Sequence, residues 1–157
     1  MIAQGQRLPE GTLSELTADG MVEHQVRELF AKKKAVMFAV PGAFTPTCSN
    51  AHLPGYVALA DEFKARGVEL IICLAVNDAF VMKAWGDDQN ASEIMMLADG
   101  NGAFTKALGL EFDTGSFGGL RSRRYAMLVE DGVVTLLNVE APKAFEISDA
   151  RTMLAAL

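Results

Sequence analysis

Cys48 is the residue with the most chemical potential, and it lies in the segment Pro41-Gly42-Ala43-Phe44-Thr45-Pro46-Thr47-Cys48-Ser49. Thr45-Pro46 is typical of a helix start, with threonine as the N-cap and proline at the first helical position. Cys48 then falls in the first turn, where the helix dipole and free backbone N–H groups favour a thiolate. The alternative is a buried structural cysteine, the commoner fate of this residue type. A helix start flanked by threonine and serine favours the reactive thiol.

Thr45 stands three residues before Cys48, where a Cys-x-x-Cys motif would carry its first cysteine. A dithiol exchange site is therefore absent. The Thr45 hydroxyl could act as an N-cap or could orient an oxygen-containing substrate near the sulfur, and the sequence leaves both roles open. Pro41 ends an apolar run, either as a simple strand stop or as a rigid lid that shields the thiolate from water.

Lowering the pKa of the Cys48 thiol would by itself raise the reaction rate only about a few-fold. More thiolate is present at neutral pH, but the thiolate of a more acidic thiol is a weaker nucleophile. Most of the acceleration must come from donors that stabilise charge in the transition state. An arginine supplies both a positive charge and a fork of donors. The candidates are Arg121, Arg123 and Arg124. In the strand that follows, side chains alternate between two faces, and spacing alone does not choose between Arg123 and Arg124.

Two further residues could take part in thiol chemistry. Cys73 lies within an apolar run, which favours a small buried hydrophobe over a second reactive thiol. His52 stands one helical turn after Cys48, so a Cys-His pair of the kind found in cysteine hydrolases is an alternative. The spacing of two cysteines and two histidines matches no zinc pattern.

These residues need a scaffold, and the hydrophobic pattern predicts one. Residues 35–40 and 68–76 are apolar runs typical of buried strands, and between them a helix from Thr45 ends at Gly67, with a kink expected at Pro54. A strand–helix–strand unit implies parallel pairing. Before the first strand the sequence predicts a peripheral hairpin within the first thirty residues and a helix over 28–34. After residue 76 it predicts a helix from Asn77 or Asp78 to about Trp85, a strand over 94–98 and a helix over 102–108 stopped by Gly109. The last predicted elements are a hairpin of strands 124–130 and 133–139 and a C-terminal helix capped by Ser148.

The order of these elements is that of a thioredoxin-like α/β domain, a central mixed β-sheet flanked by helices with an N-terminal hairpin extension. At 157 residues and with no visible linker, we expect a single domain over 1–157. Fourteen basic and twenty acidic residues give a net charge of −6, which disfavours nucleic acid as a partner. No apolar run approaches the length of about 20 residues needed to span a membrane, and no secretory signal is visible. We therefore expect a cytoplasmic protein with free thiols.

The chain resembles the peroxiredoxins, specifically the type II group also called peroxiredoxin five or redoxin. The combination of Pro-x-x-x-Thr-x-x-Cys with a downstream arginine–aromatic strand is highly specific, and the resemblance covers nearly the whole chain. It rests on Pro41 to Ser49, His52 to Tyr56, Val76 to Phe80, Leu97 to Asp99, Arg123 to Tyr125 and Leu137 to Glu140.

This resemblance implies a thiol peroxidase that uses no cofactor and no metal. Cys48 matches the peroxidatic cysteine, which attacks a peroxide oxygen and becomes a sulfenic acid. Thr45 and Pro41 match pocket residues, and Arg124, placed before an aromatic residue at a strand start, matches the arginine that stabilises thiolate and peroxide. The implied substrates are hydrogen peroxide and alkyl hydroperoxides, and peroxynitrite is a further candidate.

The chain departs from animal type II enzymes, which carry a resolving cysteine near the C-terminus, because no cysteine follows Glu140. We therefore expect an external thiol to reduce the sulfenic acid, glutathione with glutaredoxin first and thioredoxin second. The family also implies a homodimer. The alternative function is a redox sensor or interaction module of thioredoxin fold, in which Cys48 is oxidised without turnover.

Overall fold

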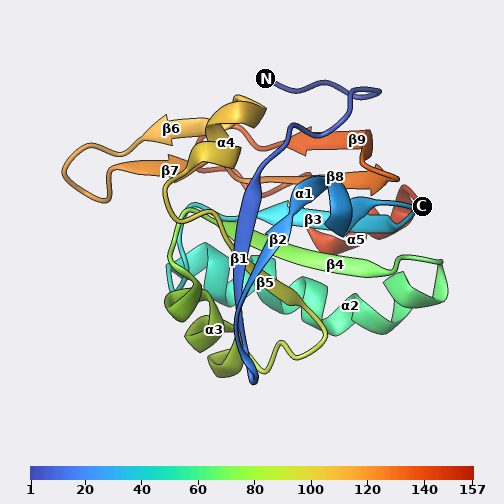
Figure 1. The fold of residues 1–157 in the computed structure, drawn as a ribbon, viewed down its shortest axis with the longest axis horizontal. Helices are drawn as coiled ribbons and strands as arrows, with labels where there is room; N and C mark the ends of the chain where they lie inside the picture. Colours follow the sequence, from blue (N-terminus) through green and yellow to red (C-terminus); the bar gives the residue numbers. More distant parts are fainter.

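The computed structural model describes residues 1–157 and places strand β3 (Lys34–Ala39) within a seven-stranded mixed sheet (Figure 1). This strand pairs in parallel with β4 (Leu70–Ala75) and antiparallel with β8 (Tyr125–Glu130). The order across the sheet is β2-β1-β5-β4-β3-β8-β9. The remaining strands are β1 (Thr12–Thr17), β2 (Gly20–Gln25), β5 (Met95–Ala98) and β9 (Val133–Val139), of which β2 and β9 form the edges. The thioredoxin-like α/β fold expected from the sequence is confirmed.

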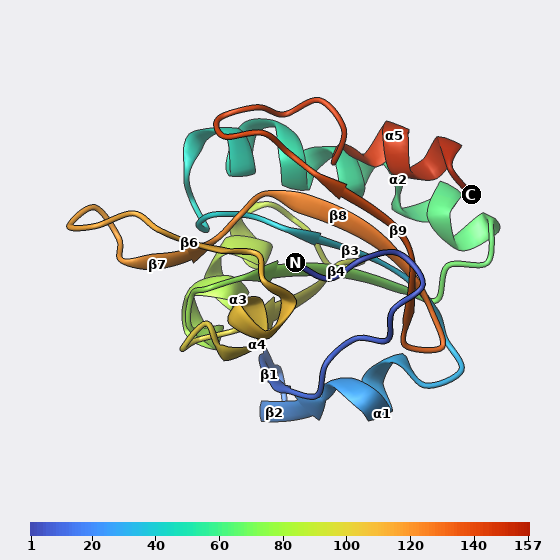
Figure 2. The same ribbon diagram turned by 90° about the horizontal axis from the view of Figure 1, so that it is seen from above.

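After Lys34, strand β3 is apolar and buried because both faces of the sheet are covered. Successive side chains point to opposite faces, so its residues divide between two cores. One core lies against α2 (Leu53–Ala65), α3 (Ala79–Asp88) and α5 (Ala150–Ala155), and the other lies against α1 (Val26–Phe30) and α4 (Ala103–Leu108). Figure 2 shows α2 and α5 together on one side of the sheet and α1 on the other. The first core receives Val36 and Phe38, and the second receives Ala35, Met37 and Ala39.

Near Pro54, where the sequence predicts a kink, the helix after β3 contains a wider turn. The chain is helical from Pro46, passes through a π-helical turn η1 (Cys48–His52), and continues as α2. Proline cannot donate to the carbonyl four residues before it, and in the turn just before it the Leu53 N–H bonds the Cys48 carbonyl five residues back. The predicted stop is confirmed: Gly67 has a φ of +89°, and the N–H groups of residues 67 and 68 close the helix end.

Most of the other predicted elements are present. The N-terminal hairpin is β1–β2, Asp78 caps α3 by accepting from the Val81 N–H, and α4 ends at Gly109 in a left-handed conformation. The hairpin β8–β9 is also confirmed, with a register shift between Leu128 and Val129.

Two predictions of helix ends are wrong, and one pair of strands was not predicted. Helix α1 begins and ends earlier than 28–34, and it cannot continue through Lys32 because the chain turns there with a φ of +56°. The cap of α5 is Asp149, which accepts from the Thr152 N–H, because the Ser148 hydroxyl is bonded elsewhere. A two-stranded sheet of β6 (Glu111–Asp113) and β7 (Leu120–Ser122) was not predicted, and its loop projects from the side of the molecule (Figure 1). No helix combines the length and apolar character that crossing a bilayer requires.

Candidate active site

Cys48 opens the π-helical turn, and its side chain is fully buried. The predicted position in the first turn of a helix is confirmed. Arg124, the residue just before β8, reaches the sulfur from the strand next to β3: its Nη2 donates to Cys48 Sγ at 3.1 Å. Ala126 and Leu128 belong to the same core as Cys48, whereas Tyr125 and Met127 belong to the other. The alternation along β8 therefore places Arg124, and not Arg123, on the face that carries the thiol.

The same guanidinium holds His52. Arg124 Nη1 lies 2.8 Å from His52 Nδ1, and His52 Nε2 lies 3.0 Å from the Ser148 carbonyl oxygen. Arginine can only donate and a carbonyl can only accept, so Nδ1 is the bare nitrogen and Nε2 carries the proton. Burial, together with the neighbouring Arg124 charge, lowers the pKa of His52 from its usual 6.5 to about 3. His52 is thus a neutral side chain that orients the arginine.

Glu140 fixes the loop that supplies the Ser148 carbonyl. Its carboxylate accepts the N–H groups of Glu146, Ile147 and Ser148 and the Ser148 hydroxyl, at distances from 2.7 to 3.0 Å. Burial alone would raise the pKa of Glu140, but these hydrogen bonds outweigh it and hold the pKa below its usual value. A chain of hydrogen bonds therefore runs from Glu140 through Ser148, His52 and Arg124 to the sulfur.

Aromatic rings complete the support around His52. Its ring lies 4.9 Å from those of Phe38 and Phe145, and Phe38 stacks on Tyr56 at 3.9 Å. The Tyr56 hydroxyl donates to the same Ser148 carbonyl at 2.8 Å. The Arg124 guanidinium also lies over the Phe145 ring, 5.8 Å from its centre. The arginine is held by an acceptor on one side and an aromatic face on another.

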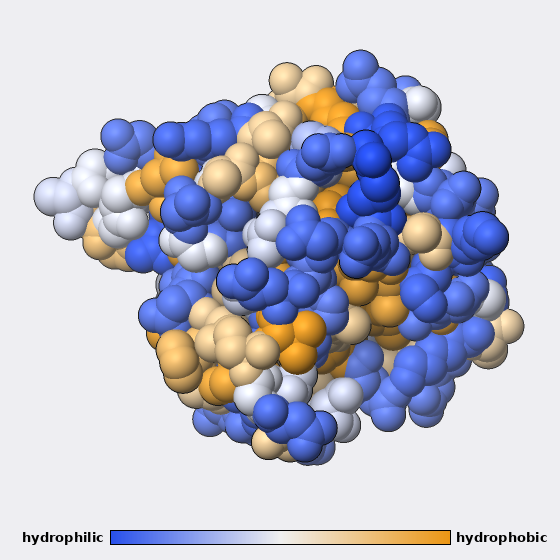
Figure 3. Space-filling model, viewed as in Figure 1, coloured by the Kyte–Doolittle hydropathy of each residue, from blue (hydrophilic) through white to orange (hydrophobic).

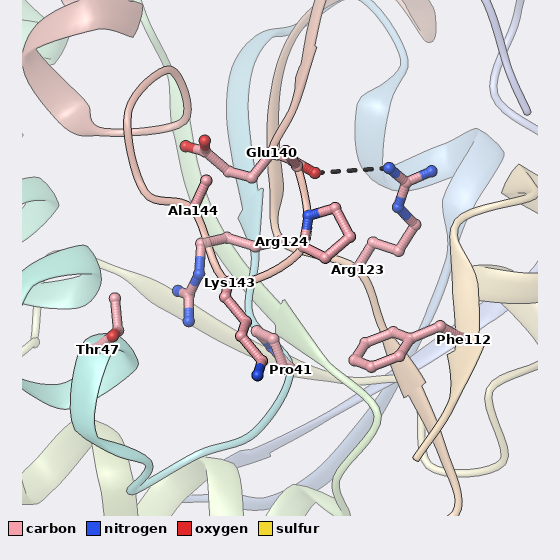
Figure 4. A pocket seen from close by; sticks show the side chains of 10 residues that line it. Pro41, Thr47, Phe112, Arg123, Arg124, Glu140, Lys143 and Ala144 are labelled. Carbon is pink, nitrogen blue, oxygen red and sulfur yellow. Dashed lines mark hydrogen bonds between the residues drawn. The ribbon is translucent and has the colours of Figure 1, made fainter.

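Thr45 and Pro41 both lie on the loop between β3 and the helix. Thr45 Oγ1 donates to the Gly42 carbonyl at 2.7 Å and accepts from no helical N–H, so of the two roles that the sequence left open, the side-chain N-cap is not formed. The loop is also tied to the segment between β4 and α3, because the Ala43 N–H donates to the Asn77 side chain at 3.0 Å. Pro41 lines a cavity of about 400 Å³ together with Thr47 and Arg124 (Figure 4). The cavity thus opens beside the buried sulfur.

The other candidate residues have different environments. Arg121 donates to the carbonyls of Gly118 and Val76, which makes it a structural brace of the β6–β7 loop. The Arg123 side chain forms one hydrogen bond, to the Glu140 carbonyl at 3.5 Å. Cys73 is fully buried in β4, and burial raises the pKa of its thiol well above the ordinary value. Both nitrogens of His52 have partners other than Cys48, which argues against a cysteine–histidine hydrolase.

Comparison with known proteins identifies the family of this chain. The redoxin family profile matches residues 3–154. The chain belongs to the redoxin family of peroxiredoxins. It is 52% identical over 163 residues to chloroplastic peroxiredoxin-2E-2 of Oryza sativa, covering 99% of this chain and 72% of that protein. It is 46% identical over 159 residues to peroxiredoxin-2B of Arabidopsis thaliana, covering 99% and 98%. The crystal structure of reduced Prx3 of Vibrio vulnificus in complex with hydrogen peroxide superposes with a TM-score of 0.98, at 71% identity and 99% coverage of both chains.

A peroxiredoxin is a peroxidase of the oxidoreductase class that reduces peroxide at the expense of a thiol. It works with a cysteine and an external thiol reductant and uses no prosthetic group. In this peroxiredoxin no group of three or more histidine, cysteine, aspartate or glutamate side chains is arranged to hold a metal ion.

Sequence reasoning missed the supporting residues of this peroxiredoxin site. It placed His52 near Cys48 but only as a hydrolase partner, and it assigned no role to Glu140 or Phe145. One signal was available: His52 and Cys48 are four residues apart and so share a helix face. No signal in the sequence links Glu140 to Ser148, because that contact depends on the path of the loop between them.

Proposed function

We propose that Cys48 is the peroxidatic cysteine and that this peroxiredoxin reduces hydrogen peroxide and alkyl hydroperoxides. The thiolate sulfur attacks the terminal oxygen of R–O–O–H, the S–O bond forms as the O–O bond breaks, and Cys48 becomes a sulfenic acid. The leaving alkoxide takes one proton from solvent and departs as R–OH, which is water when the substrate is hydrogen peroxide. The single observation that carries this proposal is the contact of 3.1 Å between Arg124 Nη2 and Cys48 Sγ.

The proposed roles of the neighbouring residues follow from their remaining hydrogen-bonding capacity. Arg124 stabilises the thiolate and the negative charge that develops on the peroxide oxygens. The Thr45 hydroxyl already donates its hydrogen bond to the Gly42 carbonyl, so toward a substrate its oxygen can only accept, and the O–H of a hydroperoxide is a donor. Pro41 has no N–H and contributes an apolar wall beside the sulfur. Each of these groups favours the attack without itself reacting.

We further propose that an external thiol returns Cys48 to its reduced form. The sulfenic acid condenses with R′–SH to give a mixed disulfide and water, and a second thiol then releases Cys48 as a thiol together with the external disulfide. Cys73 is a poor resolving thiol because it is fully buried and protonated. Glutathione with glutaredoxin is the first choice of reductant and thioredoxin the second. A reducing compartment such as the cytoplasm is the proposed place of action.

The test is the Cys48→Ser variant, assayed for peroxide consumption with excess thiol. We expect the wild type to turn over repeatedly and the variant to retain less than a tenth of its rate. Trapping with dimedone, followed by mass spectrometry, should place the sulfenic acid on Cys48 and not on Cys73. Oxidation of Cys48 once, with no steady-state consumption in any thiol, would instead identify a redox sensor.

We also propose that the protein is a homodimer. Exposed aromatic side chains are present at the end of the molecule that holds the site, including Phe44, 52% exposed, on the active-site loop and Phe80, 64% exposed, on α3. Figure 3 shows apolar surface gathered over α3. Burial of such rings against a second copy would remove them from water. Sedimentation equilibrium tests this proposal: the wild type should have twice the mass of one chain, and the double variant Phe44→Ser, Phe80→Ser should dissociate more readily.

A further inference from the structure

The cavity beside the sulfur extends away from Cys48 along the loop that follows β9. Pro41, Thr47 and Arg124 border it at the end nearest the thiol. The loop 141–144 and Phe112 of β6 border the rest. In Figure 4 the Lys143 side chain runs along the cavity toward Pro41, and the Phe112 ring faces in from the opposite side. A volume of about 400 Å³ is far more than hydrogen peroxide requires and lies in the range of small-molecule sites.

The charge of this cavity is opposite to that of the protein. The chain has a net charge of −6, yet Arg123, Arg124 and Lys143 all line the cavity. Neither Arg123 nor Lys143 forms an ion pair, since the ion pairs of the structure join other residues. The one acidic residue at the wall, Glu140, has its carboxylate bonded to residues 146–148, and Figure 4 shows that carboxylate turned away from Arg123. Two cations are therefore left without an anionic partner.

We propose that this cavity binds the carboxylate of an organic co-substrate, and this proposal rests on the proposed peroxidase function. The apolar body of the molecule lies against Phe112, and its carboxylate pairs with Arg123 or Lys143. Two co-substrates share this chemistry: a hydroperoxide that carries a carboxylate, and a thiol that carries one. The first would present its O–O bond to Cys48 for the attack described above, and the second would present its sulfur to the sulfenic acid, releasing water.

The first arm of the test uses a matched pair of hydroperoxides, cumene hydroperoxide and its para-carboxylate derivative. The rate of Cys48 oxidation is measured by stopped flow for both, and the ratio of the two rates is compared between proteins. In the double variant Arg123→Gln, Lys143→Gln the ratio of carboxylated to neutral substrate should fall about fivefold, because each exposed charge pair contributes modestly. The control is Lys32→Gln, Lys33→Gln, which removes the same charge beyond the opposite end of β3 and should leave the ratio within twofold of wild type.

The second arm uses a matched pair of thiols, 3-mercaptopropionate and 2-mercaptoethanol, which reduce the preformed sulfenic acid. A fall in the ratio in this arm alone assigns the cavity to the reductant, and a fall in the first arm alone assigns it to the peroxide. In the affected arm, raising the salt concentration should lower the wild-type ratio as well, which requires no variant to fold. Ratios unchanged in both arms would overturn the inference while leaving the peroxidase function intact. Failure to oxidise Cys48 with any peroxide would overturn the peroxidase function itself.

Discussion

Arg124 Nη2 lies 3.1 Å from Cys48 Sγ, and the Nη1 atom of the same guanidinium lies 2.8 Å from His52 Nδ1. Because the two nitrogens belong to one rigid plane, the contact with His52 sets the direction of the donor that faces the sulfur. A lysine has no such plane and could not be oriented in this way. The contact with the sulfur is thus the last of a series of fixed hydrogen bonds.

We expect Arg124→Gln to slow the attack of Cys48 on hydrogen peroxide by about two orders of magnitude, because one charged donor to the transition state is lost. Stopped-flow measurement of the oxidation step isolates this rate from reduction by thiol. Arg27→Gln is the control, since that arginine pairs with Glu10 on the surface and should leave the rate unchanged. A change of less than fivefold in Arg124→Gln would show that another group stabilises the developing charge.

Much of the scaffold follows from local patterns in the sequence. The apolar run of β3 predicts a doubly covered strand, and Thr45-Pro46 and Gly67 mark the start and end of the helix that carries Cys48. Strong local signals of this kind do not depend on distant contacts. The position of Cys48 in the first helical turn could therefore be predicted from residue types alone.

The parts that sequence reasoning missed depend on contacts between distant segments. Alternation along β8 divides Arg123 from Arg124, but only pairing with β3 shows which face carries the sulfur. The Glu140 carboxylate takes the Ser148 hydroxyl, and Asp149 caps α5 in its place. Residues 111–113 and 120–122 form strands of three residues joined by a glycine-rich loop, too short for a period to be recognised.

His52 should act as a positioning residue, and two variants separate its hydrogen bonds from its bulk. His52→Leu removes the acceptor for Arg124 and the donor to Ser148, and we expect peroxide attack to slow about tenfold, since a hydrogen bond to a charged group is lost. His52→Gln keeps one acceptor and one donor on the side chain and should restore most of the rate. Equal losses in both variants, measured by the same stopped-flow assay, would show that the imidazole ring itself is required.

Stability should fall as the solution is made acidic, because of His52. In the folded protein its pKa is lowered to about 3, so between that value and 6.5 the unfolded chain binds a proton that the folded chain does not. The free energy of unfolding then decreases by about 1.4 kcal/mol for each pH unit below 6.5 on account of this group. Glu140, whose pKa is also lowered in the folded state, adds a second loss once the pH falls below about 4.5. Neither group destabilises the protein at neutral pH.

Urea unfolding at pH 7.5 and pH 5.0 measures this effect. The loss of stability between the two should be about 2 kcal/mol smaller in His52→Gln than in the wild type, because glutamine does not titrate. His24→Gln removes the other histidine, which is partnered by Glu15, and should retain the loss. An identical acid loss in His52→Gln and the wild type would mean that His52 is protonated in the folded protein.

Cys73→Ala tests whether the second thiol takes part in turnover. Cys73 is fully buried in β4, and burial raises the pKa of its thiol, so both access and ionisation oppose a resolving role. We expect steady-state peroxide consumption with glutathione and glutaredoxin to stay within twofold of wild type, with a loss of about 1 kcal/mol in the free energy of unfolding from the small cavity created. If the variant instead consumes one equivalent of peroxide and stops, Cys73 must become exposed during the cycle, and the buried environment seen here belongs to the reduced state alone.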